Sequence, residues 1–367
     1  MKSYCIMHLE RHVATIRADG SCTIYFPQFM PYNLYLEKAE ADAYDTRVNN
    51  VTNFYAWCSS RVLTLDRKYA KEILNSLGLK QAVSDKERAE IAVSYHCLSL
   101  TDVYWVREKG DTTTFSEISL YHHSLSDAFV DVALRGRSLT ARNAEMLAER
   151  DYAGDVATAG VAPKAWVRRN GEFCLLKDGS ADEVNHEILA SQIAQCFDVD
   201  QVAYELTDFE GEPVSSCTLI TSEETGIVAA EFVDIYAANH DTTLMEIVKK
   251  KDIYGFHMMN IIDYLVGNTD RHWGNWGFTV DNRTNKLGKL YPLMDFNRAF
   301  SAYDTVEGVR SLTVPGKSQM EAAIEAAKAI GLPVKADVRG EWFPDEATRV
   351  MFRERLRVLE DCTGSSK

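Results

Sequence analysis

A stretch that is apolar on nearly every side, IYGFHMMNIIDYLVG at residues 253–267, limits the fold more than any other part of this sequence. Its pattern predicts an α-helix, and Gly267 is a typical helix end. A helix without a polar face has no side suited to water, so we expect this helix to be buried.

A crowded polar segment, GNTDRHWGNWGF at 267–278, follows that helix directly. One interpretation is a hydrogen-bonded turn, with later carboxylates incidental to it. The other is a catalytic loop in which Asp270 is the base and Asn275 a metal ligand. Strands predicted at 276–280 and 289–296 flank the polar turn DNRTNKLG and would bring Asn275 and Asp295 to one metal ion. Their hard oxygen atoms suit Mg²⁺ or Mn²⁺.

The composition places the chain among ordinary globular proteins. With 367 residues, 46% apolar and 26% charged, it is long enough for two or three domains. A formal net charge of −14 and a pI of about 5.2 disfavour bulk binding to DNA or anionic membranes, although a local basic patch at Arg135, Arg137 and Arg142 stays open. We therefore expect no direct nucleic-acid partner and no membrane partner.

The cysteines and the apolar runs predict where the protein works. None of the eight cysteines forms a CxxC pair, and Cys174, Cys196 and Cys217 stand among apolar neighbours, as reduced core cysteines do. The opening segment MKSYCIMHLERH has too short an apolar run for a signal peptide, and no stretch is long enough for a membrane helix. We therefore expect a cytoplasmic protein.

The chain is expected to divide near residue 150, where the small, unperiodic stretch DYAGDVATAGVAP begins. Residues 1–150 are predicted to form an N-terminal α+β domain, followed by a strand-rich segment at 151–222 and a helical segment at 223–367. In the first domain we expect strands at 3–8, 12–17, 22–26 and 103–107, and helices at 66–78, 125–134 and after a capping box of Ser84 and Glu87.

The strand-rich segment is predicted to form two β-hairpins with a helix between them. The turn Asn170-Gly171 separates AWVRR from EFCLLK at 172–177, which is typical of a β-hairpin. Helical spacing follows at 183–197. A second hairpin is predicted from VAYEL at 202–206 and SSCTLIT at 216–222, and further helices at 318–330 and 344–361.

Phosphoryl transfer needs a lysine on the phosphates, metal ions, and an acceptor for the proton of the incoming hydroxyl group. Lys177 ends the apolar strand FCLLK, from which its ammonium group could reach the α- and β-phosphates. The alternative is a strand-edge lysine in solvent. Glu187, early in the following helix, is expected to pair with Lys177. Glu183 is a competing partner, and an exposed helical glutamate is the alternative interpretation.

The loop before this hairpin, ATAGVAPK at 157–164, is a candidate phosphate-binding loop. Its small residues, among them Gly160 and Val161, would let backbone N–H groups approach the phosphates. Lys164 is a candidate phosphate contact and Thr158 a candidate site of self-modification. A plain linker is the alternative interpretation of the same residues.

The other side chains of the 267–278 segment have two interpretations. His272 either contacts a terminal phosphate or orders the loop, and the second role is the one we favour. Arg271 is expected to pair with a nearby carboxylate. Trp273 and Trp276 are expected in the core rather than as stacking platforms for a base.

With these residues in view, the chain resembles the HipA-like kinases, bacterial Ser/Thr kinases named after a persistence toxin, and more distantly the phosphatidylinositol kinases. The matching strings are AGVAPKAWV, CLLK, HEILASQIA, NTDRHWGN and LMDF, across about residues 155–300. The resemblance implies an α+β, bilobal protein-kinase-like fold, with a β-rich N-lobe, a helical C-lobe and the extra N-terminal domain. It also implies ATP and Mg²⁺.

The resemblance also implies roles for individual residues. Asp270 would be the base, Asn275 and Asp295 the metal ligands, and Lys177 the phosphate contact, while Thr158 or a neighbour would be self-phosphorylated. Asn297 stands where protein kinases carry the glycine of their DFG motif. Residues 1–150 are not matched to the toxin's N-terminal part, so an antitoxin-like protein partner stays open.

These features together predict ATP- and Mg²⁺-dependent phosphoryl transfer. The acceptor ranked first is a Ser/Thr hydroxyl group of a protein, which the sequence does not identify. Two alternatives remain at this point. One is a lipid or small-molecule kinase on the same fold, and the other is a nucleotide-binding pseudokinase that regulates a partner.

Overall fold

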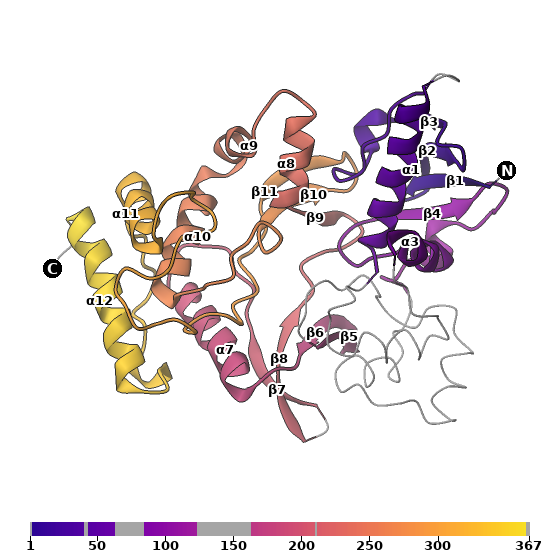
Figure 1. The fold of residues 1–367 in the computed structure, drawn as a ribbon. Helices are drawn as coiled ribbons and strands as arrows, with labels where there is room; N and C mark the ends of the chain where they lie inside the picture. Colours follow the sequence, from indigo (N-terminus) through magenta and orange to yellow (C-terminus); the bar gives the residue numbers. More distant parts are fainter. Residues whose placement is uncertain (1, 40–42, 63–83, 123–162, 210, 365–367) are drawn as a thin grey trace. The chain divides into compact units, whose positions relative to one another are not determined.

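The chain folds into two compact units (Figure 1). A computed structural model describes residues 2–39, 43–62, 84–122, 163–209 and 211–364. Unit 1 comprises Met1–Asp178, Thr221–Gly226 and Val280–Lys286, and unit 2 comprises Gly179–Ile220, Ile227–Thr279 and Leu287–Lys367. Several predictions lie outside the described residues: the helices at 66–78 and 125–134, the basic residues Arg135, Arg137 and Arg142, and the loop residues Thr158, Gly160 and Val161.

Unit 1 contains an antiparallel sheet in the strand order β3-β2-β1-β4. Four consecutive residues are buried in each of its first two strands, so both faces of these strands are covered. Its strands are β1 (Ser3–His8), β2 (Arg11–Arg17), β3 (Cys22–Ile24) and β4 (Tyr104–Glu108). The ring of Tyr4 stacks on that of Phe54 in α1 (Tyr44–Ser59), with centroids 5.4 Å apart, so this helix covers the sheet.

The described residues of this part of unit 1 form three further short helices. They are the 3₁₀-helix η1 (Pro27–Phe29), α3 (Asp85–Ser94) and α4 (Phe115–Ile118). The predicted capping box at the start of α3 is confirmed, because Ser84 Oγ accepts from Glu87 N at 3.2 Å and Glu87 Oε2 accepts from Ser84 N at 3.0 Å. Helix α3 packs against α1.

Unit 1 also carries the predicted hairpin of β5 (Lys164–Arg169) and β6 (Glu172–Lys177). Both turn residues have positive φ, 51° at Asn170 and 87° at Gly171, which is the backbone of a two-residue hairpin turn. The turn fixes the register, and this register places Lys164 directly opposite Lys177.

In unit 2, α7 (Ala181–Gln195) is followed by the hairpin of β7 (Glu205–Phe209) and β8 (Glu212–Thr218). The predicted helix and hairpin are confirmed, but the strands lie closer to their turn than the predicted 202–206 and 216–222. The reason is that Val202 has another partner: its N–H donates to the carbonyl of Leu293 at 2.8 Å, outside the hairpin.

The helices of unit 2 centre on α10 (Ile253–Val266), which packs against α11 (Gln319–Ile330) and α12 (Glu346–Thr363) (Figure 1). Ten of its residues are buried, as its all-round apolar pattern predicts. The remaining helices are α8 (Ala230–Ala238), α9 (Leu244–Lys251) and the 3₁₀-helix η2 (Gly340–Trp342).

A three-stranded sheet in the order β11-β10-β9 lies largely in unit 2. Its strands are β9 (Thr225–Ala229), β10 (Gly277–Asp281) and β11 (Lys286–Leu290). Strand β10 agrees with the predicted 276–280. The predicted strand at 289–296 is wrong, because β11 ends at Leu290 and the chain then passes Pro292 in an irregular segment. No helix among the described residues is both long and apolar enough to cross a membrane.

Candidate functional site

The polar loop begins at a fixed point, the left-handed end of α10. Gly267 has φ 59°, and a Cβ there would lie 2.5 Å from the ring of Tyr303 and 3.0 Å from the guanidinium group of Arg355. Only glycine fits both the backbone angle and this space. The helix therefore delivers the following residues to one place in unit 2.

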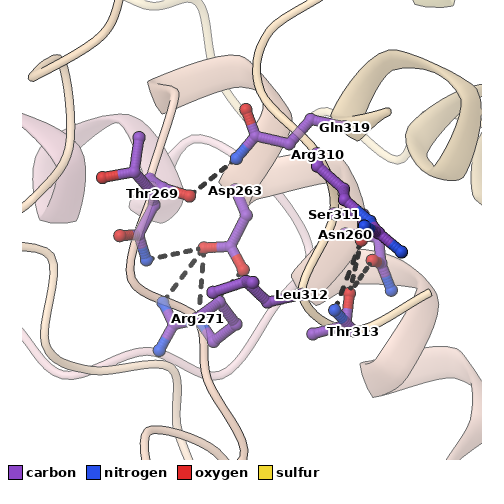
Figure 2. A pocket seen from close by; sticks show the side chains of 10 residues that line it. Asn260, Asp263, Thr269, Arg271, Arg310, Ser311, Leu312, Thr313 and Gln319 are labelled. Atoms are coloured by element: carbon purple, nitrogen blue, oxygen red, sulfur yellow. Dashed lines mark hydrogen bonds and ion pairs between the residues drawn. The ribbon is translucent and has the colours of Figure 1, made fainter. Parts of the chain in front are cut away.

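A buried ion pair ties the loop back to the helix (Figure 2). Arg271 Nε lies 2.9 Å from Asp263 Oδ2, and its Nη2 donates to Asp263 Oδ1 at 3.0 Å. Asn268 Nδ2 donates to the same Oδ1 at 3.0 Å. The side chains of the pair are only 3% and 8% exposed. The predicted pairing of Arg271 with a carboxylate is thus confirmed, and its partner is on α10.

The remaining guanidinium nitrogen of Arg271 joins two separate segments. Nη1 donates to the carbonyl of Asn275 at 2.8 Å and to the carbonyl of Met294 at 2.6 Å. Burial would lower the pKa of Arg271, but the charge of Asp263 outweighs it and raises that pKa, so the cation persists. One side chain therefore holds Asn275 beside the residue that precedes Asp295.

Asp270 and Asn275 are also joined directly. Asn275 Nδ2 donates to the backbone carbonyl of Asp270 at 2.8 Å, so its Oδ1 points the other way and is the atom left for a ligand. The carboxylate of Asp270 is half-buried, and no other described residue donates a hydrogen bond to it. A carboxylate in this state can accept a proton from a hydroxyl group that approaches it.

His272 is exposed and acts within the loop. Its ring Nδ1 accepts from the backbone N–H of Gly274 at 3.0 Å, and its backbone N–H donates to the carbonyl of Asp270 at 2.8 Å. These bonds favour the loop-ordering interpretation, while a phosphate contact stays a prediction. Trp276 is 2% exposed, as expected of a core residue, but Trp273 is 37% exposed, so the core prediction is wrong for it.

Asp295 occupies a strained backbone position. Its φ is 60°, in the left-handed region that residues other than glycine seldom adopt. Its N–H donates to Tyr204 Oη at 3.1 Å, and Leu293 forms a parallel bridge with Gln201. Asp295 therefore does not close a strand, as predicted, but sits on an irregular segment held by Arg271 on one side and Tyr204 on the other.

Glu187 is buried rather than exposed. It is 1% exposed on α7, and its Oε2 accepts from Ser215 Oγ at 2.7 Å. The competing candidate Glu183 caps the same helix, since its carboxylate accepts from the N–H of Ser180 at 3.0 Å. The exposed-glutamate interpretation of Glu187 is therefore wrong, and its pairing with Lys177 stays a prediction.

Lys164 and Lys177 form a cross-strand pair on one face of the hairpin in unit 1. They are 8% and 7% exposed, so neither is the solvent lysine of the alternative interpretation. Directly opposite residues have Cβ atoms about 5 Å apart. The two side chains therefore start from the same face of the hairpin, and their positive charges could both act on one anion.

The donor atoms of the loop fit one kind of metal ion. Among the described residues, no three His, Cys, Asp or Glu side chains gather into a metal-binding cluster. Mg²⁺ does not need such a cluster, because it keeps several waters and binds one or two protein oxygens together with substrate phosphates. The Oδ1 of Asn275 and the carboxylate of Asp295 fit this set.

Three contributors to the loop escaped the sequence-based prediction: Asp263, Asn268 and Gln319, whose Nε2 donates to the carbonyl of Asn268 at 2.6 Å. A signal for Asp263 exists, since a carboxylate inside a fully buried helix needs a partner. The other two are polar residues of common types and give no such signal.

No known protein-family model matches the sequence, and no curated protein matches it. Solved structures do match. A chain of the Shewanella oneidensis MR-1 toxin–antitoxin complex of HipA, HipB and operator DNA aligns over 98% of this chain and 97% of its own, with TM-score 0.51 and 12% identity. The Helicobacter pylori proinflammatory kinase CtkA aligns over 57% of this chain and 92% of its own, with TM-score 0.43 and 14% identity.

The likeness to the Shewanella chain is one of fold. It confirms, at that level, the resemblance to HipA-like kinases that the sequence motifs indicate. It also extends over almost the whole length, including the N-terminal residues that the motifs do not cover. The division into an N-terminal domain and two kinase lobes stays a prediction.

Proposed function

We propose that this protein is an ATP- and Mg²⁺-dependent kinase that phosphorylates Ser or Thr hydroxyl groups of a protein. The observation that carries the proposal is the Arg271 clamp, which holds the carbonyls of Asn275 and Met294 with one nitrogen. It supports a site in which Asp270, Asn275 and Asp295 act together, since these are the base and the oxygen ligands that phosphoryl transfer requires.

Each of these residues has a defined part in the proposed reaction. The acceptor hydroxyl oxygen bonds to the γ-phosphorus, the bond from that phosphorus to the bridging oxygen breaks, and ADP leaves. The hydroxyl proton passes to the Asp270 carboxylate. Bound Mg²⁺, held by Asn275 and Asp295, would supply positive charge to the phosphates. Arg271 keeps these backbones in position and touches no reacting atom.

The lysine pair of unit 1 would supply the remaining positive charge. Lys164 and Lys177 are neighbours on one face of their hairpin, and ammonium groups form charge-assisted hydrogen bonds with phosphate oxygens. We propose that Lys177 binds the α- and β-phosphates, that Lys164 assists it, and that Glu187 orients Lys177. Thr158 stays the proposed site of self-phosphorylation, with Gly160 and Val161 in the loop beside it.

The direct test is phosphate transfer from γ-labelled ATP in the presence of Mg²⁺. The wild-type protein should label itself or a protein in a bacterial lysate, and Asp270→Asn should reduce that rate about 100-fold or more. Asp337→Asn is the matched control, because Asp337 is an exposed aspartate of the same unit. No labelling of any protein by the wild-type chain would refute the proposal. Labelling of phosphatidylinositol vesicles alone would favour the lipid-kinase alternative.

Binding of nucleotide tests the lysines separately from the chemistry. Lys177→Met should weaken ATP binding in calorimetry about tenfold, since it removes a buried charge-assisted contact. Asp270→Asn should bind ATP as the wild type does. Unchanged affinity in Lys177→Met would remove the lysine pair from the proposed site.

The solved Shewanella complex contains HipB and operator DNA beside HipA. By analogy we propose a protein partner of antitoxin type for this chain, and no direct contact with DNA, given its net charge of −14. The purified protein alone should leave the mobility of duplex DNA unchanged at low salt. A shift that disappears with added salt would contradict this expectation.

A further inference from the structure

A shallow pocket in unit 2 opens next to the loop that carries the proposed base, with room for about one water molecule (Figure 2). Thr269 and Arg271, the residues on either side of Asp270, lie along one wall. Segment 310–313 lies along the opposite wall. The pocket thus brings segment 310–313 next to the two chain neighbours of Asp270.

The second wall is held rigidly from behind. Arg310 forms an antiparallel bridge with Ser318, and the N–H of Ser311 donates to the carbonyl of Lys317 at 2.9 Å. Thr313 Oγ1 donates to Asn260 Oδ1 on α10 at 2.5 Å and shares a hydrogen bond of 3.1 Å with Ser311 Oγ. The wall is thus a fixed surface rather than a loose loop.

Buried and exposed side chains alternate along segment 310–313, so two of its side chains face the solvent. Ser311 and Thr313 are 7% and 8% exposed, whereas Leu312 is 47% exposed and Arg310 is exposed as well. In the part of the chain that the structure describes, no carboxylate lies within ion-pair distance of Arg310. An arginine without a carboxylate partner can bind an acidic side chain that approaches it, and an exposed leucine can pack against an apolar one.

We propose that Arg310 and Leu312 select the acceptor, and that the acceptor is an extended Ser- or Thr-containing segment of a protein with an acidic and an apolar side chain next to its hydroxyl residue. This inference rests on the proposed kinase function. Arg310 would pair with the acidic side chain, in a protein whose net charge otherwise repels acids. Leu312 would cover the apolar side chain and lose its exposure to water.

The test uses the full-length protein, ATP, Mg²⁺ and a library of synthetic peptides with a central Ser or Thr and one fixed neighbour. The wild type should favour Asp or Glu and a Leu-like neighbour. Arg310→Glu should lower kcat/KM for the acidic peptides about tenfold and favour Lys or Arg instead. Leu312→Ser should lower kcat/KM for the apolar peptides about fivefold.

Two variants serve as matched controls. Arg353→Glu reverses an exposed charge on α12, and Leu206→Ser replaces a leucine on β7 that is 59% exposed. Both should keep the wild-type peptide preference. Thermal unfolding should show that all four variants are folded, as expected of substitutions at exposed positions.

The outcomes separate this inference from the function on which it rests. Peptide transfer with the same preference in wild type and Arg310→Glu would refute the inference and leave the kinase function intact. Transfer to whole proteins but to no peptide would do the same. A wild-type protein that transfers no phosphate to any acceptor would refute the kinase function, and this inference with it.

Discussion

Among the described residues of each unit, a buried arginine binds an aspartate with two of its nitrogens. In unit 1, Arg61 donates to both carboxylate oxygens of Asp102, at 2.8 and 2.7 Å. In unit 2, Arg271 does the same to Asp263 at 2.9 and 3.0 Å. In both, burial would lower the pKa of the arginine, but the facing carboxylate raises it. As ion pairs, the two are nearly equivalent.

They differ in what the remaining nitrogens hold. Arg61 also donates to the carbonyls of Cys97 and Tyr104, which fix the chain just before and within strand β4. Arg271 donates to the carbonyls of Asn275 and Met294. The first pair stabilises a sheet, and the second positions residues of the proposed catalytic site. The role of a buried ion pair therefore depends on which backbone carbonyls its arginine also binds, and the pair alone does not reveal it.

The largest expected effect is on stability and is shared by both pairs. Arg61→Met and Arg271→Met each leave a buried aspartate without its partner, which costs about 3–5 kcal/mol. Hydrogen exchange resolved by segment should show the loss in unit 1 for the first variant and in unit 2 for the second. Arg353→Met, at an exposed position, is the control. If either variant were as stable as this control, the two pairs would not be equivalent.

The next effect should separate the pairs. Lysine keeps the charge but not the fork of donors, so Arg271→Lys should still fold yet lose the bond to Asn275 or Met294. We expect phosphate transfer to fall about 100-fold, the effect of a displacement of about 1 Å at an active site. Arg61→Lys is the matched control and should retain its transfer rate. Equal losses in both variants would remove the distinction drawn here.

Acid should destabilise unit 1 through a single buried histidine. His8 of unit 1 is 1% exposed between Phe29 and Tyr104, and burial, helped by the charge of Arg11, lowers its pKa from 6.5 to about 4. Between pH 6.5 and 4, His8 binds a proton in the unfolded chain but stays neutral in the folded chain. Unit 1 should therefore lose up to about 1.4 kcal/mol of stability per pH unit between 6.5 and 4.

The measurement is urea unfolding at several pH values, compared with His8→Leu. The variant lacks the titrating ring, so its stability should fall less steeply over this pH range. Parallel slopes in the two proteins would show that His8 is not responsible for the acid sensitivity. The comparison of slopes is independent of any change that the substitution makes at neutral pH.

Much of the fold is predictable from local patterns. The capping box at Ser84, the hairpin turn at Asn170 and the end of α10 at Gly267 are short-range signals, and the structure confirms each of them. The segment at 289–296 carries no comparable signal. Its extended-looking pattern continues past Leu290, but the chain there is held by Tyr204 and Arg271, contacts that no local window contains.

The site divides in the same way. Asp270 and Asn275 are five positions apart in one loop, so the sequence alone is enough to connect them. Asp295 could be named as a candidate but not placed correctly, because its left-handed backbone depends on distant partners. In the sequence, Asp263 is one polar residue in an apolar helix. Only the folded chain shows that it binds Arg271 and so holds the loop in place.

The smallest predicted effect compares two capping boxes with the same geometry. Ser84 begins α3 in unit 1 and Ser318 begins α11 in unit 2, and each bonds the N–H of a glutamate at 3.2 Å. Alanine at either serine should cost about 1 kcal/mol of stability. Only Ser318→Ala should also slow phosphate transfer, since the next residue, Gln319, holds the carbonyl of Asn268 in the loop.

Threonine at position 318 provides the control, because its hydroxyl group can cap the helix as serine does. Ser318→Thr should restore both stability and transfer, whereas Ser84→Ala should change stability alone. A transfer rate that falls equally in Ser84→Ala and Ser318→Ala would mean that activity follows overall stability. The distinction between a pair that stabilises a sheet and a pair that positions a loop would then lose its support, because loosening either unit would affect the chemistry alike.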